Sequence, residues 1–167
     1  DVDAKVAQVA AAIKSTCRRL DIPVPEIHME PGRSIVGAAG LTLYTCGTVK
    51  QIPGYKNYVS IDGGMTDNPR FALYRASYTC LPANKMTEPC VLEASVVGRC
   101  CESGDIIQEH VLLPASIGRG DIVAVCTTGA YNYSMASHYN RLAKPPVVML
   151  RRGESYVAVH RESLSDL

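Results

Sequence analysis

Cys101 and Glu102 form the most unusual chemical pair in this sequence. They lie within the string RCCESGD, residues 99–105, which places a thiol beside a carboxylate where a strand is expected to turn. A neighbouring carboxylate disfavours the thiolate form, which suits a proton donor better than a nucleophile. Cysteine is more often a small buried hydrophobe and a turn glutamate is more often simply solvated, so both interpretations stay open.

Arg70 and Tyr74 could bind a small anion. They lie four residues apart after the turn Asp62-Gly63-Gly64, so a helix there would place both on one face. A guanidinium and a phenol on one face suit a carboxylate. From spacing alone, an ordinary turn with a solvated arginine is the commoner outcome.

Two further strings lie at the ends of expected elements. Residues 30–33, Glu-Pro-Gly-Arg, follow a short predicted strand, at the end where α/β folds bind ligands. Tyr131 follows a turn at Gly129 and precedes a short predicted helix whose first amides could accept an anion. Alternatively, Glu30 and Arg33 form a surface ion pair and Tyr131 packs in the core.

The composition argues against several other classes of function. There are 17 Lys and Arg against 16 Asp and Glu, a net charge of +1, so no long-range field favours nucleic acid or an anionic membrane. No apolar run approaches the roughly 20 residues that a membrane-spanning helix needs. The 7 cysteines and 4 histidines lack metal-ligand spacing. We therefore predict a cytoplasmic protein with no metal, nucleic-acid or membrane partner.

An α/β segment is expected at the start of the chain. Apolar residues recur there at helical spacing: Val2, Val6, Val9, Ile13, Cys17 and Leu20. Pro23 and Pro25 end this helix, and a short strand is expected over 26–29. Such a half-unit of an α/β barrel or doubly wound sheet cannot close a sheet by itself.

From Gly37 onward the pattern changes to short β-rich runs. Seven candidate strands separated by glycine and proline turns predict a sandwich or barrel: 41–49, 58–61, 91–97, 106–113, 122–126, 147–150 and 156–160. A short helix is expected between Tyr131 and Tyr139. We predict a mainly β protein, with an α/β barrel remnant over 1–35 and a β domain over 36–167, and interpret the chain as a fragment.

Taken together, four strings resemble one family. EPGRSIVG, YVSIDGGMTDNPRFALY, GRCCESGDII and GDIVAVCTTGAYNYSMASHYNR occur in the order and approximate spacing of the diaminopimelate decarboxylases, alanine-racemase-like pyridoxal-phosphate enzymes. The resemblance implies that residues 1–35 belong to a TIM-like barrel that carries the cofactor. It implies a homodimer whose β domain completes the site across the interface. The implied reaction converts meso-2,6-diaminopimelate to L-lysine and carbon dioxide, the last step of lysine biosynthesis.

The resemblance also assigns roles to single residues. Those matching cofactor-binding positions are Glu30, Gly32, Arg33 and Tyr131, with Glu30 pairing with the pyridine nitrogen. Those matching substrate-binding positions are Arg33, Arg70, Tyr74, Glu102 and Tyr131. Cys101 matches the catalytic proton donor to the α-carbon. The chemistry agrees, since arginines suit the distal carboxylate of this amino-acid substrate and Glu102 suits its distal ammonium.

One departure from the family limits what this chain can do. The family's cofactor lysine and glycine-rich phosphate loop lie early in the barrel, and no stretch here matches either. We therefore expect the isolated chain to bind no pyridoxal phosphate and to be inactive.

Two alternatives stay open. The first is a fragment of an ornithine- or arginine-type decarboxylase, although Cys101 followed by Glu102, rather than by aspartate, favours diaminopimelate. The second is a non-catalytic β-domain module that binds a partner chain. Retention of Cys101, Glu102 and Tyr131 argues against it, since a binding module needs no proton donor.

Overall fold

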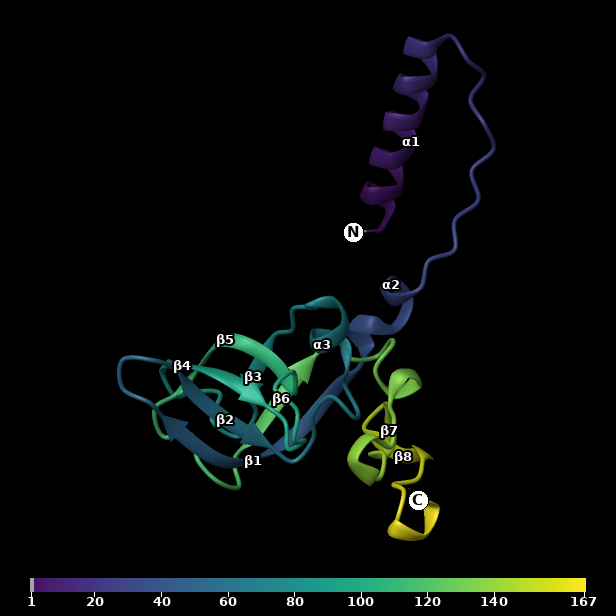
Figure 1. Ribbon diagram of the computed structural model, residues 1–167. Coiled ribbons are helices and arrows are strands. Elements are labelled where there is room, and N and C mark those ends of the chain that lie inside the picture. Colours follow the sequence, from purple (N-terminus) through teal and green to yellow (C-terminus); the bar gives the residue numbers. More distant parts are fainter. Residues whose placement is uncertain (1) are drawn as a thin grey trace. The chain divides into compact units, whose positions relative to one another are not determined.

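The computed structural model describes residues 2–167, which divide into two compact units (Figure 1). One unit ends at Pro31, and the other spans Gly32–Leu167. The first contains helix α1 (Val2–Leu20), with Asp3 in its first turn and Arg18 and Arg19 in its last, where their charges complement the helix dipole. This helix confirms the prediction from apolar spacing.

The predicted strand over 26–29 does not form. Residues 22–31 have no regular structure after the helix ends, where the Ile22 amide donates to the Cys17 carbonyl at 3.0 Å. A strand needs a neighbour with which to exchange hydrogen bonds, and this unit contains no other strand within the described residues. The prolines therefore end the helix as expected, but extended sequence preference alone does not make a strand.

The second unit opens with two short helical segments and then forms a six-stranded sheet. Helix α2 (Arg33–Val36) and the 3-10 turn η1 (Gly37–Ala39) lead into the sheet, whose strand order is β3-β6-β1-β2-β4-β5. Neighbouring strands are antiparallel except for the parallel pair β2 and β4. The strands are β1 (Leu41–Gln51), β2 (Asn57–Ile61), β3 (Cys80–Pro82), β4 (Cys90–Val97), β5 (Ile106–Pro114) and β6 (Ile122–Cys126).

The sheet curls into a nearly closed, barrel-like form. Its two edge strands, β3 and β5, contact each other, and the Tyr78 amide before β3 donates to Oε1 of Gln108 in β5 at 2.8 Å. The core inside is made of apolar residues with no exposed surface: Val59, Val96, Ile107, Leu113, Val123 and Val125. Burial of β-branched side chains from alternating strand positions explains this core. The prediction of a mainly β protein with a sandwich or barrel is confirmed.

A separate hairpin follows the sheet. Strands β7 (Val147–Arg151) and β8 (Glu154–Val159) pair through a turn in which Arg152 and Gly153 have φ of +53° and +81°. Two successive residues with positive φ are typical of tight hairpin turns. Both strands were predicted, although the short helix expected between Tyr131 and Tyr139 is replaced by two 3-10 turns, η2 (Tyr133–Met135) and η3 (Tyr139–Arg141).

Candidate functional site

Four of the predicted site residues meet on the second unit. The Arg33 guanidinium lies 5.5 Å from the centre of the Tyr131 ring, and the Arg70 guanidinium lies 5.6 Å from the same ring. Arg70 also lies 5.0 Å from the ring of Tyr74, one turn along helix α3 (Arg70–Tyr74). Cation–π attraction therefore holds two cations around one phenol. We call Arg33, Arg70, Tyr74 and Tyr131 the arginine–tyrosine cluster.

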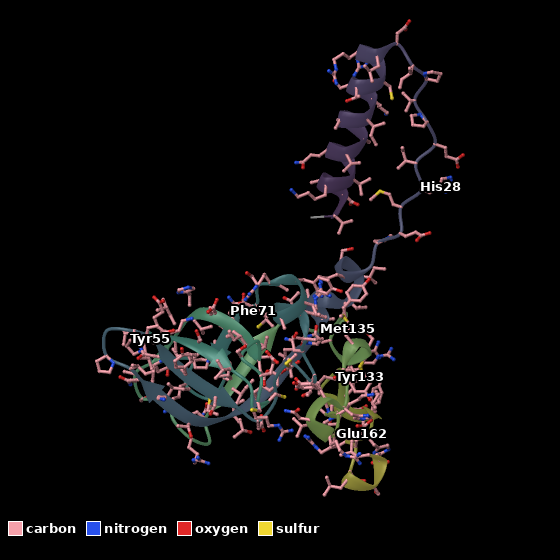
Figure 2. All side chains as sticks on the ribbon, viewed as in Figure 1. His28, Tyr55, Phe71, Tyr133, Met135 and Glu162 are labelled. Atoms are coloured by element: carbon pink, nitrogen blue, oxygen red, sulfur yellow. The ribbon has the colours of Figure 1, made fainter. Side chains whose placement is uncertain are left out.

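The cluster has buried donors without acceptors. Arg33 donates through Nη1 to the Thr127 carbonyl at 3.1 Å, but its buried Nη2 has no hydrogen-bond partner. Arg70 contacts the sulfur of Met135 at 3.7 Å, while its buried Nε has no partner. Met135 lies in the segment between the barrel-like sheet and the hairpin (Figure 2). Within residues 2–167, neither arginine forms an ion pair with a carboxylate. A cluster of this kind can bind an anion such as a carboxylate or a phosphate.

Tyr131 is held in a strained backbone conformation close to Gly32. Its φ is +61°, a region that costs a non-glycine residue about 1 kcal/mol or more. A Cβ at Gly32 would overlap the Tyr131 hydroxyl. A Cβ at Gly129, two residues before Tyr131, would overlap the Val36 carbonyl oxygen. The two glycines thus allow the loop after β6 to approach the α2 segment, which explains how Tyr131 reaches Arg33.

A buried carboxylate shapes the loop before α3. We call this loop, residues 62–69, the glycine loop. Asp67 accepts from the Gly64 amide at 2.9 Å and from the Tyr44 hydroxyl. Burial raises the pKa of Asp67 above its ordinary value, despite these two hydrogen bonds. Burial, followed by the charge of Asp67, also raises the pKa of Tyr44 well above its ordinary value. The loop is therefore anchored in the core just before Arg70 begins α3.

Cys101 and Glu102 lie in the loop between β4 and β5, residues 98–105, which we call the thiol loop. Both side chains are exposed, and Glu102 accepts from the Gly104 amide at 3.0 Å through Oε1. Among residues 2–167, no hydrogen bond, ion pair or ring contact joins either residue to the arginine–tyrosine cluster. The adjacent Cys100 is less exposed, and burial together with the charge of Asp105 raises the pKa of its thiol to about 11.

The remaining predicted site residue, Glu30, belongs to the first unit. It lies in the segment without regular structure, and no hydrogen bond or ion pair engages its carboxylate among residues 2–31. The structure thus brings together Arg33, Arg70, Tyr74 and Tyr131, with Gly32 against Tyr131. Among residues 32–167, no hydrogen bond, ion pair or ring contact joins Cys101 or Glu102 to them.

Three residues that sequence analysis did not single out shape the site. Met135 contacts Arg70, Asp67 anchors the glycine loop, and Asp105 bonds to both loops. Each aspartate stands near glycines in a turn, and this spacing is the only sequence signal that could have indicated them. The described residues contain no group of three or more His, Cys, Asp or Glu that could hold a metal ion. No helix in this part of the chain is long and apolar enough to cross a membrane.

Residues 11–129 match the pyridoxal-dependent decarboxylases over their C-terminal sheet domain. The chain belongs to this family. It is similar to the diaminopimelate decarboxylase of Bacillus subtilis (strain 168), with 46% identity over 162 residues, covering 97% of this chain and 37% of that protein. The corresponding enzyme of Staphylococcus aureus (strain COL) is 48% identical over 166 residues, covering 99% of this chain and 39% of that protein.

A solved structure of a pyridoxal-dependent decarboxylase has the same fold. The diaminopimelate decarboxylase of M. jannaschii in complex with L-lysine matches with a TM-score of 0.78 and 30% identity, covering 92% of this chain and 35% of that one. The chain thus spans 37–39% of the length of the two curated relatives. The family likeness also accounts for the mainly β architecture of the second unit.

Proposed function

We propose that this chain is the C-terminal part of a diaminopimelate decarboxylase, a carboxy-lyase that converts meso-2,6-diaminopimelate to L-lysine and carbon dioxide. The observation that carries the proposal is the arginine–tyrosine cluster, where Nη2 of Arg33 and Nε of Arg70 are buried without acceptors. The substrate has a carboxylate at each end, and such a group would satisfy these donors. The names of the relatives, at 46% and 48% identity, support this choice over an ornithine- or arginine-type enzyme.

The residues present fit a negatively charged cofactor as well as the substrate. Gly32, Arg33 and Tyr131 would hold pyridoxal phosphate, since Gly32 leaves room for the Tyr131 hydroxyl and Arg33 has an unused donor. Glu30 would accept a hydrogen bond from the pyridine nitrogen and so keep that nitrogen protonated. When bound, this cofactor supplies an electron sink for the bond that breaks as carbon dioxide leaves.

The other residues would act on the substrate itself. Arg33, Arg70, Tyr74 and Tyr131 bind and orient it by hydrogen bonds and charge. Glu102 binds the distal ammonium, and its exposed carboxylate uses one oxygen, Oε1, within its own turn. Cys101 donates a proton to the α-carbon after decarboxylation, a role that suits an exposed thiol outside the cluster.

The same proposal covers domains, partners and compartment. Residues 1–35 are the end of a cofactor-carrying barrel and residues 36–167 are the β domain. The parent enzyme is a cytoplasmic homodimer that shares each site between subunits. Sharing would unite the cluster with Cys101 and Glu102, which no hydrogen bond, ion pair or ring contact joins to it within residues 2–167 of one chain. The isolated chain binds no pyridoxal phosphate and is inactive, because the cofactor lysine belongs to the rest of the barrel.

Carbon dioxide release tests the function directly. The 167-residue chain is compared with a longer protein that joins it to the preceding barrel of the Bacillus subtilis relative, each with added pyridoxal phosphate and meso-diaminopimelate. We expect release only from the longer protein. Equal or greater release from ornithine would overturn the substrate assignment, and release from the short chain would overturn the argument from the missing lysine. No release from either would favour the non-catalytic module.

A further inference from the structure

Asp105 connects the thiol loop to the glycine loop. This carboxylate is 4% exposed and is the last residue of the thiol loop. Its Oδ1 accepts from the Met65 amide at 2.6 Å, and its Oδ2 accepts from the Cys100 amide at 2.7 Å. One side chain therefore binds the backbones of two loops whose bonded residues lie far apart in the sequence.

Glycines on both loops make this connection possible. A Cβ at Gly64 would lie 2.5 Å from Oδ1 of Asp105, and a Cβ at Gly98 would overlap the same carboxylate. Two backbone hydrogen bonds reinforce the contact: Gly98 donates to the Asp105 carbonyl at 2.8 Å, and Arg99 donates to the Gly63 carbonyl at 3.2 Å. Because Gly64 and Gly98 have no side chain, the Asp105 carboxylate has room beside them.

The two backbone amides replace water around the buried carboxylate of Asp105. Within residues 2–167 it forms no ion pair with a lysine, arginine or histidine. A buried carboxylate is tolerated only when hydrogen-bond donors replace its water, and bonds to an ionised acceptor are stronger than neutral ones. Separating the loops would remove the Met65 amide and leave Oδ1 of the buried carboxylate without its donor, so this hydrogen bond holds the loops together.

We propose that Asp105 is a positioning residue that fixes the thiol loop, with Cys101 and Glu102, onto the glycine loop that leads into Arg70 and Tyr74. The inference rests on the proposed function for the roles of those four residues. The connection between the loops rests on the hydrogen bonds of Asp105 and of Arg99 with Gly63, and does not depend on the proposed function. Asp105 acts through the backbone and does not itself contact a substrate group.

Hydrogen–deuterium exchange of the 167-residue chain tests the connection. The wild-type Met65 and Cys100 amides should exchange at least about tenfold more slowly than the Cys101 amide, for which no acceptor is found among residues 2–167. Asp105→Asn keeps the shape but turns an amide donor toward one of the two backbone donors. It should speed exchange at Met65, Cys100 or both by about tenfold.

Asp121→Asn is the matched control. Asp121 also accepts a backbone amide, from Gly118 at 2.7 Å, in a turn that contributes no residue to the proposed site. Its substitution should leave exchange at Met65 and Cys100 unchanged. Equal wild-type exchange at Met65, Cys100 and Cys101 would overturn the proposal without any variant, so failure of Asp105→Asn to fold does not remove the test.

Kinetics of the longer protein separate positioning from simple stability. We expect Asp105→Asn to lower kcat about tenfold or more through misplacement of Cys101, with a smaller change in KM, while Asp121→Asn changes neither. An unchanged kcat would overturn the positioning role even if exchange is faster. Absence of activity in the unsubstituted longer protein would instead contradict the proposed function, and exchange alone would then decide whether Asp105 joins the loops.

Discussion

The arginine–tyrosine cluster and the thiol loop would act on the same substrate, yet they are built in opposite ways. In the cluster the functional side chains are held by one another, and buried guanidinium nitrogens have no acceptor. In the thiol loop the backbone is bonded by Asp105 and Glu102, and the functional side chains are displayed to solvent. The cluster would thus be completed by an anion, whereas the thiol loop is completed by hydrogen bonds with the glycine loop.

The largest effect on kcat is expected from loss of the Cys101 thiol, the proposed proton donor in the thiol loop. In the longer protein, Cys101→Ala should lower kcat by about 100- to 10,000-fold, the range for loss of a general acid. Stability should change little because the Cys101 side chain is exposed. Cys90→Ala is the control, since this exposed cysteine lies in β4 away from the proposed site. An unchanged kcat for Cys101→Ala in steady-state kinetics would contradict the role of Cys101 as proton donor.

A smaller effect on substrate binding is expected in the cluster. Arg70→Met should raise KM by about 10- to 100-fold, because a charge-assisted hydrogen bond to the substrate carboxylate is lost. Arg119→Met, at an exposed turn before β6, should leave KM unchanged. An equal response of the two variants would show that the unpaired Arg70 donor does not serve the substrate.

Replacing a glycine by alanine should destabilise the protein more in the arginine–tyrosine cluster than in an ordinary turn. Gly32→Ala places a Cβ where the Tyr131 hydroxyl lies, so the free energy of unfolding should fall by about 1–3 kcal/mol. The control is Gly118→Ala, because the nearest atom to its Cβ is 3.9 Å away. Urea denaturation measures both. A Gly32→Ala variant as stable as Gly118→Ala would mean that Tyr131 moves away without cost.

The smallest effect is a dependence on pH that has opposite signs for two aspartates. The pKa of Asp67 is raised by burial, so ionising it costs stability as pH rises above the ordinary carboxyl range. Wild type should therefore lose stability relative to Asp67→Asn between about pH 4 and pH 7. The pKa of Asp121 is lowered, first by its hydrogen bond from Lys85, so its stabilising contribution is present above about pH 4 and is lost below it. Wild type should therefore lose stability relative to Asp121→Asn as pH falls from about pH 4 to about pH 2. Urea denaturation at these three pH values checks both windows, and a loss for the Asp67 pair on acidification or for the Asp121 pair on alkalinisation would contradict this account.

The sequence indicated most strands and part of the site because periodicity and turn residues are local signals. Arg70 and Tyr74 do share a helix, and β6 lies where its apolar run predicts it. Strand β3 was missed because Cys80–Pro82 is too short to show alternation. The contact of Gly32 with Tyr131 and the burial of Asp105 depend on residues distant in sequence, so no local pattern could reveal them.

The pairing of β1 with β6 has a consequence for synthesis of the chain. Leu41 at the start of β1 pairs with Cys126 at the end of β6, and the Gly40 carbonyl accepts from the Thr128 amide at 3.0 Å. Contacts between residues so distant in sequence form slowly because a long loop must close first. On the ribosome, the β6 side of β1 must therefore wait until β6, the last strand of the sheet in the sequence, has emerged. Until then this edge of β1 is unpaired and exposed to chaperones or to aggregation.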